Sequence, residues 1–321
     1  MKSICLMLLP ILCLSISTID ANAQAWPSKP LTAIVPVGAG STTDIIPRIV
    51  FEQLSSQLGQ NIIVENRAGA GTTLGAAVVA KSSPDGYTVL VNSSAHAISP
   101  SLYPNLTYNP AHDFAAVIPL GISAGVLVVS PAKGWKTVGD FVAAARAKPG
   151  VMNFSSVGIG SGTHLSAERF VHSAGIKAVH VPFKGGAEAM TEVIAGRMDF
   201  FFGPVGLVLP YVREGRLSAL VVNTATRSDA LPDVPTTQEA GFADAEYPLW
   251  FGMFLPAKTP RDVVDKLHDE TLKALQTAKV KEKLGALGVD PMVMTPAEFQ
   301  AFVEKDIALN ATLVKALGLV Q

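Results

Sequence analysis

Residues 31–44 read Leu-Thr-Ala-Ile-Val-Pro-Val-Gly-Ala-Gly-Ser-Thr-Thr-Asp, an apolar run that leads into glycine and hydroxyl residues. Residues 152–164 read Met-Asn-Phe-Ser-Ser-Val-Gly-Ile-Gly-Ser-Gly-Thr-His and follow the same order. We call residues 38–44 loop 1 and residues 158–164 loop 2. Four of their seven positions agree, namely two glycines, a serine and a threonine. Each loop follows an expected strand and enters an expected helix.

Strand-like and helix-like runs alternate outward from both loops, which predicts an α/β fold with mostly parallel sheets flanked by helices. The expected strands are residues 31–37, 61–65, 87–91, 125–130, 152–155, 179–183, 199–202 and 217–223. The expected helices are residues 44–58, 74–81, 138–147, 163–173, 187–195, 261–275 and 297–317. The two loops fall in two separate strand–helix sets, and a chain of this length predicts two domains.

Loops of this kind suit a negatively charged ligand. Glycines allow a tight turn and close approach to a ligand, and the first amides of a helix lack internal partners. Together with the helix dipole these amides attract anions. One loop on each lobe therefore predicts an anion held in a cleft. The alternative is that each loop is a helix cap, since Ser41 and Asp44 resemble a capping box, and Asp44 itself is better suited to a structural role. His164 could donate to a carboxylate or could simply cap or pack.

Enzyme motifs are absent from the sequence. Loop 2 lacks the spacing of a dinucleotide-binding loop, no Walker-type lysine is present, and Ser41 and Ser161 lack the flanking glycines of a nucleophile elbow. His164, His172 and His180 are spaced by eight residues, which we interpret as chance. No metal site and no cofactor is expected.

The N-terminus predicts export. Lys2 is followed by an apolar run from Ile4 to Ile16 and by Ala21-Asn22-Ala23, the pattern of a cleavable signal peptide over residues 1–23. The run is short for a transmembrane helix. Cys5 and Cys13 both lie in this segment, so the mature chain has no thiol.

The charge balance excludes some partners. The 25 basic and 26 acidic residues form no long block of either sign, which argues against nucleic acid and membrane surfaces. No later apolar run is long enough to cross a bilayer, so the mature product is not expected to be embedded in a membrane.

Several further motifs make the chain resemble the substrate-binding proteins of tripartite tricarboxylate transporters, the Bug receptors. The resemblance covers essentially the whole mature chain. The motifs are Trp26-Pro27, Ile34-Val35-Pro36, residues 64–71, Pro84-Asp85-Gly86-Tyr87-Thr88, residues 180–185, residues 231–236, Ala240-Gly241-Phe242 and Trp250-Phe251-Gly252.

The resemblance implies a type II periplasmic-binding-protein fold, in which two lobes joined by crossing strands close on a ligand. Lobe 1 is expected to hold residues 24–122 and 224–321, and lobe 2 residues 123–223. Loops 1 and 2 are expected to bind a carboxylate of the ligand.

The chain departs from the family pattern at two places. Ser41 stands where relatives usually have a glycine. Gly203 stands where amino-acid-binding relatives tend to carry an aspartate that faces the ligand's ammonium group, so we expect a ligand without an amine. Phe202 and Trp250 could line an apolar part of the cleft or belong to the core, and Ser93 and Ser94 could donate from the end of a strand.

The sequence thus predicts a monomeric periplasmic receptor that passes a small mono- or dicarboxylate, possibly aromatic, to membrane permease components. The alternatives are a ligand sensor for a membrane kinase and an exported hydrolase. The candidate ligand-binding residues are Gly38, Ala39, Gly40, Ser41, Thr42, Thr43, Ser93, Ser94, Ser156, Gly160, Ser161, Thr163, His164, Phe202, Gly203 and Trp250.

Overall fold

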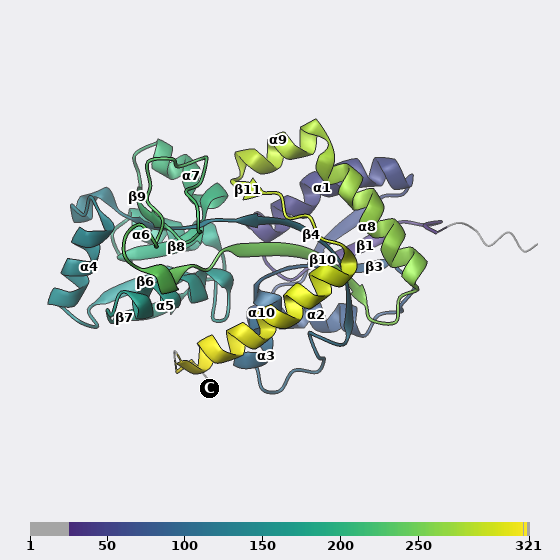
Figure 1. Cartoon of the computed structure of the whole chain (residues 1–321), viewed down its shortest axis with the longest axis horizontal. Helices are drawn as coiled ribbons and strands as arrows, with labels where there is room; N and C mark the ends of the chain where they lie inside the picture. The colour runs from purple at the N-terminus through teal and green to yellow at the C-terminus, as the bar shows by residue number, and fades with distance from the viewer. Residues whose placement is uncertain (1–25, 317, 320–321) are drawn as a thin grey trace, which may run out of the picture.

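The computed structural model describes residues 26–316 and 318–319 and has two lobes side by side, each built on one sheet (Figure 1). The strand order is β11-β4-β10-β3-β1-β2 in lobe 1 and β7-β6-β8-β5-β9 in lobe 2. The predicted α/β fold of two lobes is confirmed. The predicted signal peptide lies outside the described residues.

Lobe 1 begins with the alternation that the sequence predicts. Its first elements are β1 (Leu31–Val35), α1 (Thr42–Leu58), β2 (Ile62–Asn66), the short η1 (Ala70–Thr72), α2 (Thr73–Ala80) and β3 (Thr88–Ser93). Both β2 and β3 pair with β1 in parallel. Successive side chains of β1 point to opposite faces, so Ala33 packs with α1 and Ile34 packs with α2.

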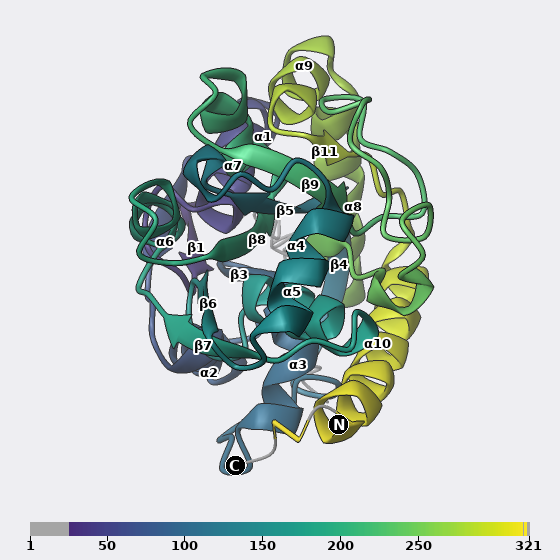
Figure 2. The ribbon, with the colours of Figure 1, turned by 90° about the vertical axis from the view of Figure 1, so that its left-hand side faces the viewer.

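Lobe 2 repeats this pattern. Its elements are β5 (Gly125–Val129), η2 (Pro131–Lys133), α4 (Val138–Ala147), β6 (Met152–Ser156), α5 (Gly162–Ser173), β7 (Ala178–Pro182), α6 (Gly186–Ile194), β8 (Phe200–Pro204), α7 (Val205–Arg213) and β9 (Ser218–Val222). Figure 2 shows α4 and α5 on one face of the sheet and α6 and α7 on the other, in agreement with the two apolar cores of this lobe.

The sheets are mixed rather than mostly parallel, and this corrects the prediction. In lobe 1, β4 (Phe114–Ser123) and β10 (Leu249–Pro256) pair with each other in antiparallel orientation, and β10 also pairs with β3. In lobe 2, β5 is antiparallel to both β8 and β9. Every antiparallel pair includes β4, β5 or β10, the strands that lead into or out of a crossing between the lobes.

Two chain segments cross between the lobes, and one buried side chain ties them together. β4 runs through Ala124 into β5 in the first crossing. Asn223 follows β9, is 0 % exposed, and accepts from the Gly125 N–H at 2.7 Å. Its Nδ2 donates to the Tyr247 carbonyl at 2.6 Å and to Ser166 Oγ of α5 at 3.2 Å. Asn223 therefore joins both crossings to the helix that follows loop 2.

The first residues after Asn223, which the predicted boundary assigns to lobe 1, pack on lobe 2 instead. Leu231 belongs to the core that includes α6 and α7. Ala245 of η3 (Ala243–Ala245) belongs to the core that includes α4 and α5. Residues 224–245 therefore cover lobe 2, and β10 carries the chain back.

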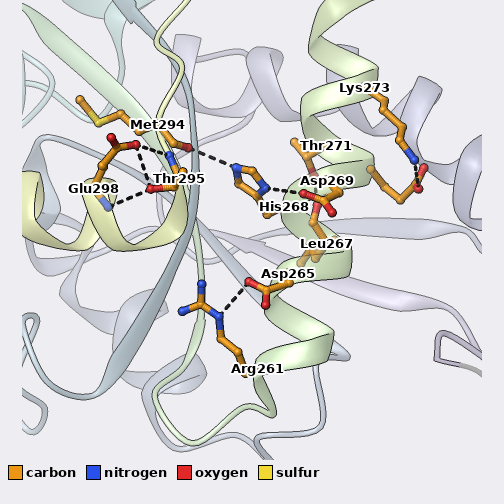
Figure 3. A network of polar contacts seen from close by, with 11 residues as sticks. Arg261, Asp265, Leu267, His268, Asp269, Thr271, Lys273, Met294, Thr295 and Glu298 are labelled. Carbon is orange, nitrogen blue, oxygen red and sulfur yellow. Dashed lines mark hydrogen bonds and ion pairs between the residues drawn. The ribbon is translucent and has the colours of Figure 1, made fainter.

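The remaining elements complete lobe 1: α3 (Ala95–Leu102), α8 (Arg261–Gln276), α9 (Ala278–Ala286), β11 (Val289–Asp290) and α10 (Pro296–Ala316). Figure 3 shows how α8 and the start of α10 are joined. His268 Nε2 lies 3.2 Å from the Met294 carbonyl. Thr295 and Glu298 form a reciprocal cap, since the Thr295 N–H donates to the Glu298 carboxylate at 2.8 Å and the Glu298 N–H donates to Thr295 Oγ1 at 3.3 Å.

Candidate ligand-binding site

Loops 1 and 2 have the same backbone geometry. Gly40 and Gly160 both have positive φ, +81° and +77°. The next residues are equally alike, with φ −76° and ψ 160° at Ser41 and φ −72° and ψ 158° at Ser161. Positive φ favours glycine because other residues are strained there. The sequence match between the loops therefore reflects one structure used twice.

The residue four positions after each of these glycines closes its loop. Asp44 Oδ2 accepts from the Gly40 N–H at 2.9 Å, and His164 Nδ1 accepts from the Gly160 N–H at 3.2 Å. Asp44 is 3 % exposed and also accepts from Arg48 Nε at 2.9 Å. Burial acts to raise the pKa of Asp44, but the hydrogen bonds hold it below its ordinary value. Asp44 thus has the structural role expected, and His164 caps its loop.

Ser94 of lobe 1 lies where the start of α5 meets that lobe. β1 and β3 are neighbouring parallel strands, so loop 1 and Ser94 both follow the carboxyl ends of adjacent strands at one edge of the sheet. From the other lobe, a Cβ on Gly162 would lie 3.1 Å from Ser94 Oγ and 2.3 Å from Leu249 Cδ2. The start of α5 thus packs tightly against the end of β3, beside loop 1.

Further contacts hold the lobes together at this edge. Leu165 of α5 is 0 % exposed and lies in the apolar core of lobe 1. Tyr103, which the sequence analysis did not identify, donates from its hydroxyl to the Ile159 carbonyl at 3.3 Å. A Cβ on Gly71 would lie 2.4 Å from that hydroxyl. Loop 2 is therefore held from lobe 1 by an aromatic side chain that no sequence motif marked.

Two serine hydroxyls at this edge are buried without a partner. Among residues 26–316 and 318–319, neither Ser41 Oγ nor Ser94 Oγ has a hydrogen-bond partner, although both atoms are buried. Ser94 is 1 % exposed. A buried hydroxyl without a partner is costly, so each such atom needs an explanation, and a bound ligand is one. Ser41 also makes no cap bond with its side chain, so the capping box considered as the alternative for loop 1 does not form.

Backbone donors at the same edge are also free. Within the described part of the chain, no acceptor faces the N–H groups of Thr42 and Thr43 in α1, or those of Gly162 and Thr163 in α5. Gly38, Ala39 and Gly40 are exposed, and a Cβ on Gly38 or Gly40 would meet no atom within 4 Å. The edge therefore presents amide donors from both lobes, with open space beside loop 1.

The hydroxyls of loop 2 hold the loop itself, which differs from the prediction that they bind ligand. Ser161 Oγ donates to the Gly158 carbonyl at 2.7 Å and accepts from the His164 N–H at 3.2 Å. Thr163 Oγ1 accepts from the Val157 N–H at 3.0 Å. Ser156 Oγ accepts from the Gly158 N–H at 3.0 Å. In lobe 1, Ser93 Oγ similarly accepts from the Ala95 N–H at 3.4 Å.

The aromatic candidates belong to packed cores. Phe202 is 0 % exposed, and its ring centre lies 5.9 Å from that of Phe170. Trp250 is 2 % exposed and donates from its indole N–H to Asp306 at 2.7 Å. We therefore correct their proposed role as cleft walls. Gly203 is also a packing position, since a Cβ there would lie 2.1 Å from Phe201 Cε1.

His180 lies in the site region and stacks on His164, a contact that the sequence analysis did not predict. It lies on β7, next to the strand that leads into loop 2, and its ring stacks on His164 with 3.9 Å between centres. Burial, with a smaller effect of His164, lowers the pKa of His180 to about 3. The spacing of these two histidines is thus structural, while His172 is exposed at the end of α5. The parallel pairing of β7 with β6, which alternating strands and helices predict, could have indicated that His180 lies beside the strand before loop 2.

A serine–histidine pair also occurs here, but its geometry does not suit catalysis. Ser156 Oγ lies 2.6 Å from His180 Nε2. Ser156 is 0 % exposed and already accepts from the Gly158 N–H, so it cannot meet a substrate as a nucleophile. Among the described residues, no three His, Cys, Asp or Glu side chains are grouped to hold a metal ion. The helices within that range include none with the length and apolarity of a membrane span.

Comparisons with known proteins agree with this architecture. A family model described as tripartite tricarboxylate transporter family receptor matches residues 46–319. BugT of Bordetella pertussis is 32 % identical, and the match covers 92 % of each chain. MatC of Rhodopseudomonas palustris, solved with bound malate, is 30 % identical with a TM-score of 0.85, covering 90 % of this chain and 100 % of MatC. A second R. palustris protein, solved with adipate, is 31 % identical with a TM-score of 0.87, covering 91 % and 98 %. The chain belongs to the tripartite tricarboxylate transporter receptor family, the Bug receptors.

Proposed function

We propose that this receptor captures a small organic acid between its lobes and delivers it to the membrane permease of a tripartite carrier. The observation that carries the proposal is the set of free donors at one edge: the Ser41 and Ser94 hydroxyls and the first amides of α1 and α5. A carboxylate accepts several hydrogen bonds at once and is attracted by helix N-termini, so it matches this set.

The relatives support the chemical class of the ligand. Malate and adipate, found in the two R. palustris proteins, are both dicarboxylates. Loop 1 has open space beside Gly38 and Gly40, where the rest of an acid could extend. The family supports the proposed partner, since its receptors are named for tripartite transporters.

The ligand in this proposal has no amine. An ammonium group in a buried site needs an acidic partner, and Gly203 supplies none. Asp44 is the carboxylate within loop 1, but it is already bound by Arg48 and Asn66. An amino acid would therefore leave its ammonium group without a counter-charge.

The proposal includes export to the periplasm, which rests on the signal-peptide pattern of residues 1–23. The proposal requires no second copy of the chain, because one molecule supplies the donors of both loops.

Calorimetry of the mature chain with matched ligands tests this function. Malate, adipate and benzoate are titrated alongside their amides and alongside aspartate and glutamate. We expect at least one acid to bind, and we expect its amide to bind at least tenfold more weakly, because the amide lacks the negative charge that the helix N-termini attract. Equal binding of acids and amides would contradict the anion site, and tighter binding of an amino acid would contradict the absence of an amine.

A further inference from the structure

His164 and His180 form a stacked pair behind loop 2. Their ring planes are 22° apart with 3.9 Å between centres, and Phe154 of β6 stacks on His180 at 5.0 Å. Phe200 of β8 continues the stack on the other side of Phe154. His164 is 3 % exposed, so water screens it little.

Each imidazole supports a different N–H group of the loop. His164 Nδ1 accepts directly from the Gly160 N–H at 3.2 Å. His180 Nε2 lies 2.6 Å from Ser156 Oγ, which in turn accepts from the Gly158 N–H at 3.0 Å. A protonated imidazole has two donors and no acceptor. The observed bond to Gly160 therefore requires His164 to be neutral, with its proton on Nε2.

The surroundings of the pair contain little charge. On α5, Glu168 Oε1 lies 3.6 Å from His164 Nε2. β6 and β8 contribute Phe154 and Phe200, which do not titrate. From lobe 1, Tyr103 reaches the adjoining Ile159 carbonyl, and burial raises the pKa of Tyr103 above its ordinary value, so it stays neutral. Two stacked imidazoles at this distance cannot both be charged without strong repulsion.

We propose that His164, with the neutral His180 stacked on it, is a positioning residue that makes ligand affinity fall as the solution becomes acidic. This inference rests on the proposed function, since loop 2 supplies half of the amide donors. A proton on His164 Nδ1 would face the Gly160 N–H as a second donor and force the loop to change shape. The free amides of Gly162 and Thr163 would then no longer point at the ligand together with those of α1.

The matched loop suggests the decisive variant. Asp44 reaches the Gly40 N–H from the position in loop 1 that His164 occupies in loop 2, and the two backbones agree. Asparagine has the same length as aspartate and an amide oxygen that accepts at every pH. The variant His164→Asn thus keeps an acceptor for Gly160 and removes the titration. His164→Ala removes both, and His172→Asn changes an exposed histidine of the same helix as a control.

The binding test is calorimetry with malate and with adipate between pH 7.5 and 5.5. We expect the wild type and His172→Asn to lose affinity by roughly threefold or more, because a proton on His164 Nδ1 removes the acceptor of the Gly160 N–H. We expect His164→Asn to show a flat profile near the affinity that the wild type has at pH 7.5. His164→Ala is expected to bind weakly at both pH values. A flat wild-type profile, or a slope that persists in His164→Asn, overturns the proposal.

A ligand-free measurement separates this inference from the proposed function. In NMR spectra of the mature protein with labelled histidine, His164 is expected to be the Nε2–H tautomer at pH 7.5. The Gly160 amide resonance is expected to shift with the same midpoint as the imidazole. If neither acid binds at pH 7.5 while these signals agree, the choice of ligand is wrong and the positioning role stands. An Nδ1–H tautomer for His164 overturns the role whatever binds.

Discussion

At the scale of single residues, the site separates hydroxyls that hold the loops from hydroxyls that are free for a ligand. Ser161 is satisfied by the Gly158 carbonyl and the His164 N–H, whereas Ser94 Oγ is buried without a partner among the described residues. A residue type alone could not reveal this difference, because a serine at a helix start can cap or donate equally well. The two kinds of serine therefore have different consequences when they are mutated.

Ser94→Ala and Ser161→Ala form a matched pair. We expect Ser94→Ala to weaken binding of the acid by about 1–3 kcal/mol while leaving the melting temperature nearly unchanged, because the hydroxyl bonds the ligand rather than the protein. We expect Ser161→Ala to lower the unfolding free energy by about 1 kcal/mol through loss of the cap. Calorimetry and thermal unfolding measure the two effects. Unchanged affinity in Ser94→Ala would remove Ser94 from the site.

His96 gives the fold a separate sensitivity to acid. It is 0 % exposed, stacks on Phe254 at 4.6 Å, and lies 3.1 Å from the Pro110 carbonyl through Nε2. Burial lowers the pKa of His96 to about 4, against the opposing effect of the Pro110 carbonyl. His96 binds a proton near pH 6.5 in the unfolded chain but only near pH 4 in the folded chain. The unfolding free energy therefore decreases as the pH is lowered from about 6.5 to about 4.

Replacing His96 by Phe removes this titration and keeps an aromatic ring against Phe254. The unfolding free energy of the wild type decreases between pH 7.5 and pH 4.5. We expect this decrease to be about 2 kcal/mol smaller in the variant. Urea unfolding at the two pH values measures this change. Identical losses in both proteins would show that His96 does not titrate in this range.

At the scale of elements, loops 1 and 2 are the same strand–loop–helix unit placed in different surroundings. Gly40 and Gly160 share the positive φ, but a Cβ on Gly40 meets nothing within 4 Å and one on Gly160 lies 2.8 Å from Leu102 Cδ1 of the other lobe. The local conformation is thus common to both, while the contact between lobes belongs to loop 2.

Alanine at the two glycines tests this distinction. Both variants are expected to lose about 1–2 kcal/mol of stability from the strained backbone. Gly160→Ala is also expected to weaken ligand binding at least tenfold, because the added methyl group pushes loop 2 away from Leu102. Thermal unfolding and calorimetry on both proteins provide the comparison. Equal affinities would mean that the lobes can adjust around the methyl group without cost.

Most strands and helices near the loops could be predicted, because glycines, prolines and apolar spacing mark them locally. β10 could not, since every residue of Leu249–Pro256 is buried and no alternation marks it. β4 contains Pro119, which argues against a strand; it lies opposite Gly252 at an irregular point of the ladder. The candidate site was found through the repeated loop, while Tyr103 and His180 reach it by tertiary packing that no short motif encodes.

At the scale of the whole molecule, the two lobes are joined through Asn223. Its amide accepts from Gly125 at the first crossing, donates to the Tyr247 carbonyl at the second, and donates to Ser166 on the helix of loop 2. The relative placement of the lobes and the direction of α5 are therefore fixed by the same side chain.

Asn223→Ala breaks all three bonds, whereas Ser166→Ala breaks one. We expect Asn223→Ala to lower the unfolding free energy by about 2–4 kcal/mol, because buried backbone groups lose their partners, and Ser166→Ala by about 1 kcal/mol. Ligand affinity is expected to fall in the same order. Chemical unfolding and calorimetry give both quantities. A larger effect of Ser166→Ala would show that the crossings do not depend on Asn223.

Leu165 sits on α5 of lobe 2, yet its side chain is completely buried in the core of lobe 1. Any motion that parts the lobes must bring this leucine into water, at about 2 kcal/mol. Burial of Leu165 therefore stabilises the contact between the lobes. Because apolar attraction weakens on cooling, this contact is weaker at low temperature. We therefore expect the lobes to separate more often at low temperature than at warm growth temperatures.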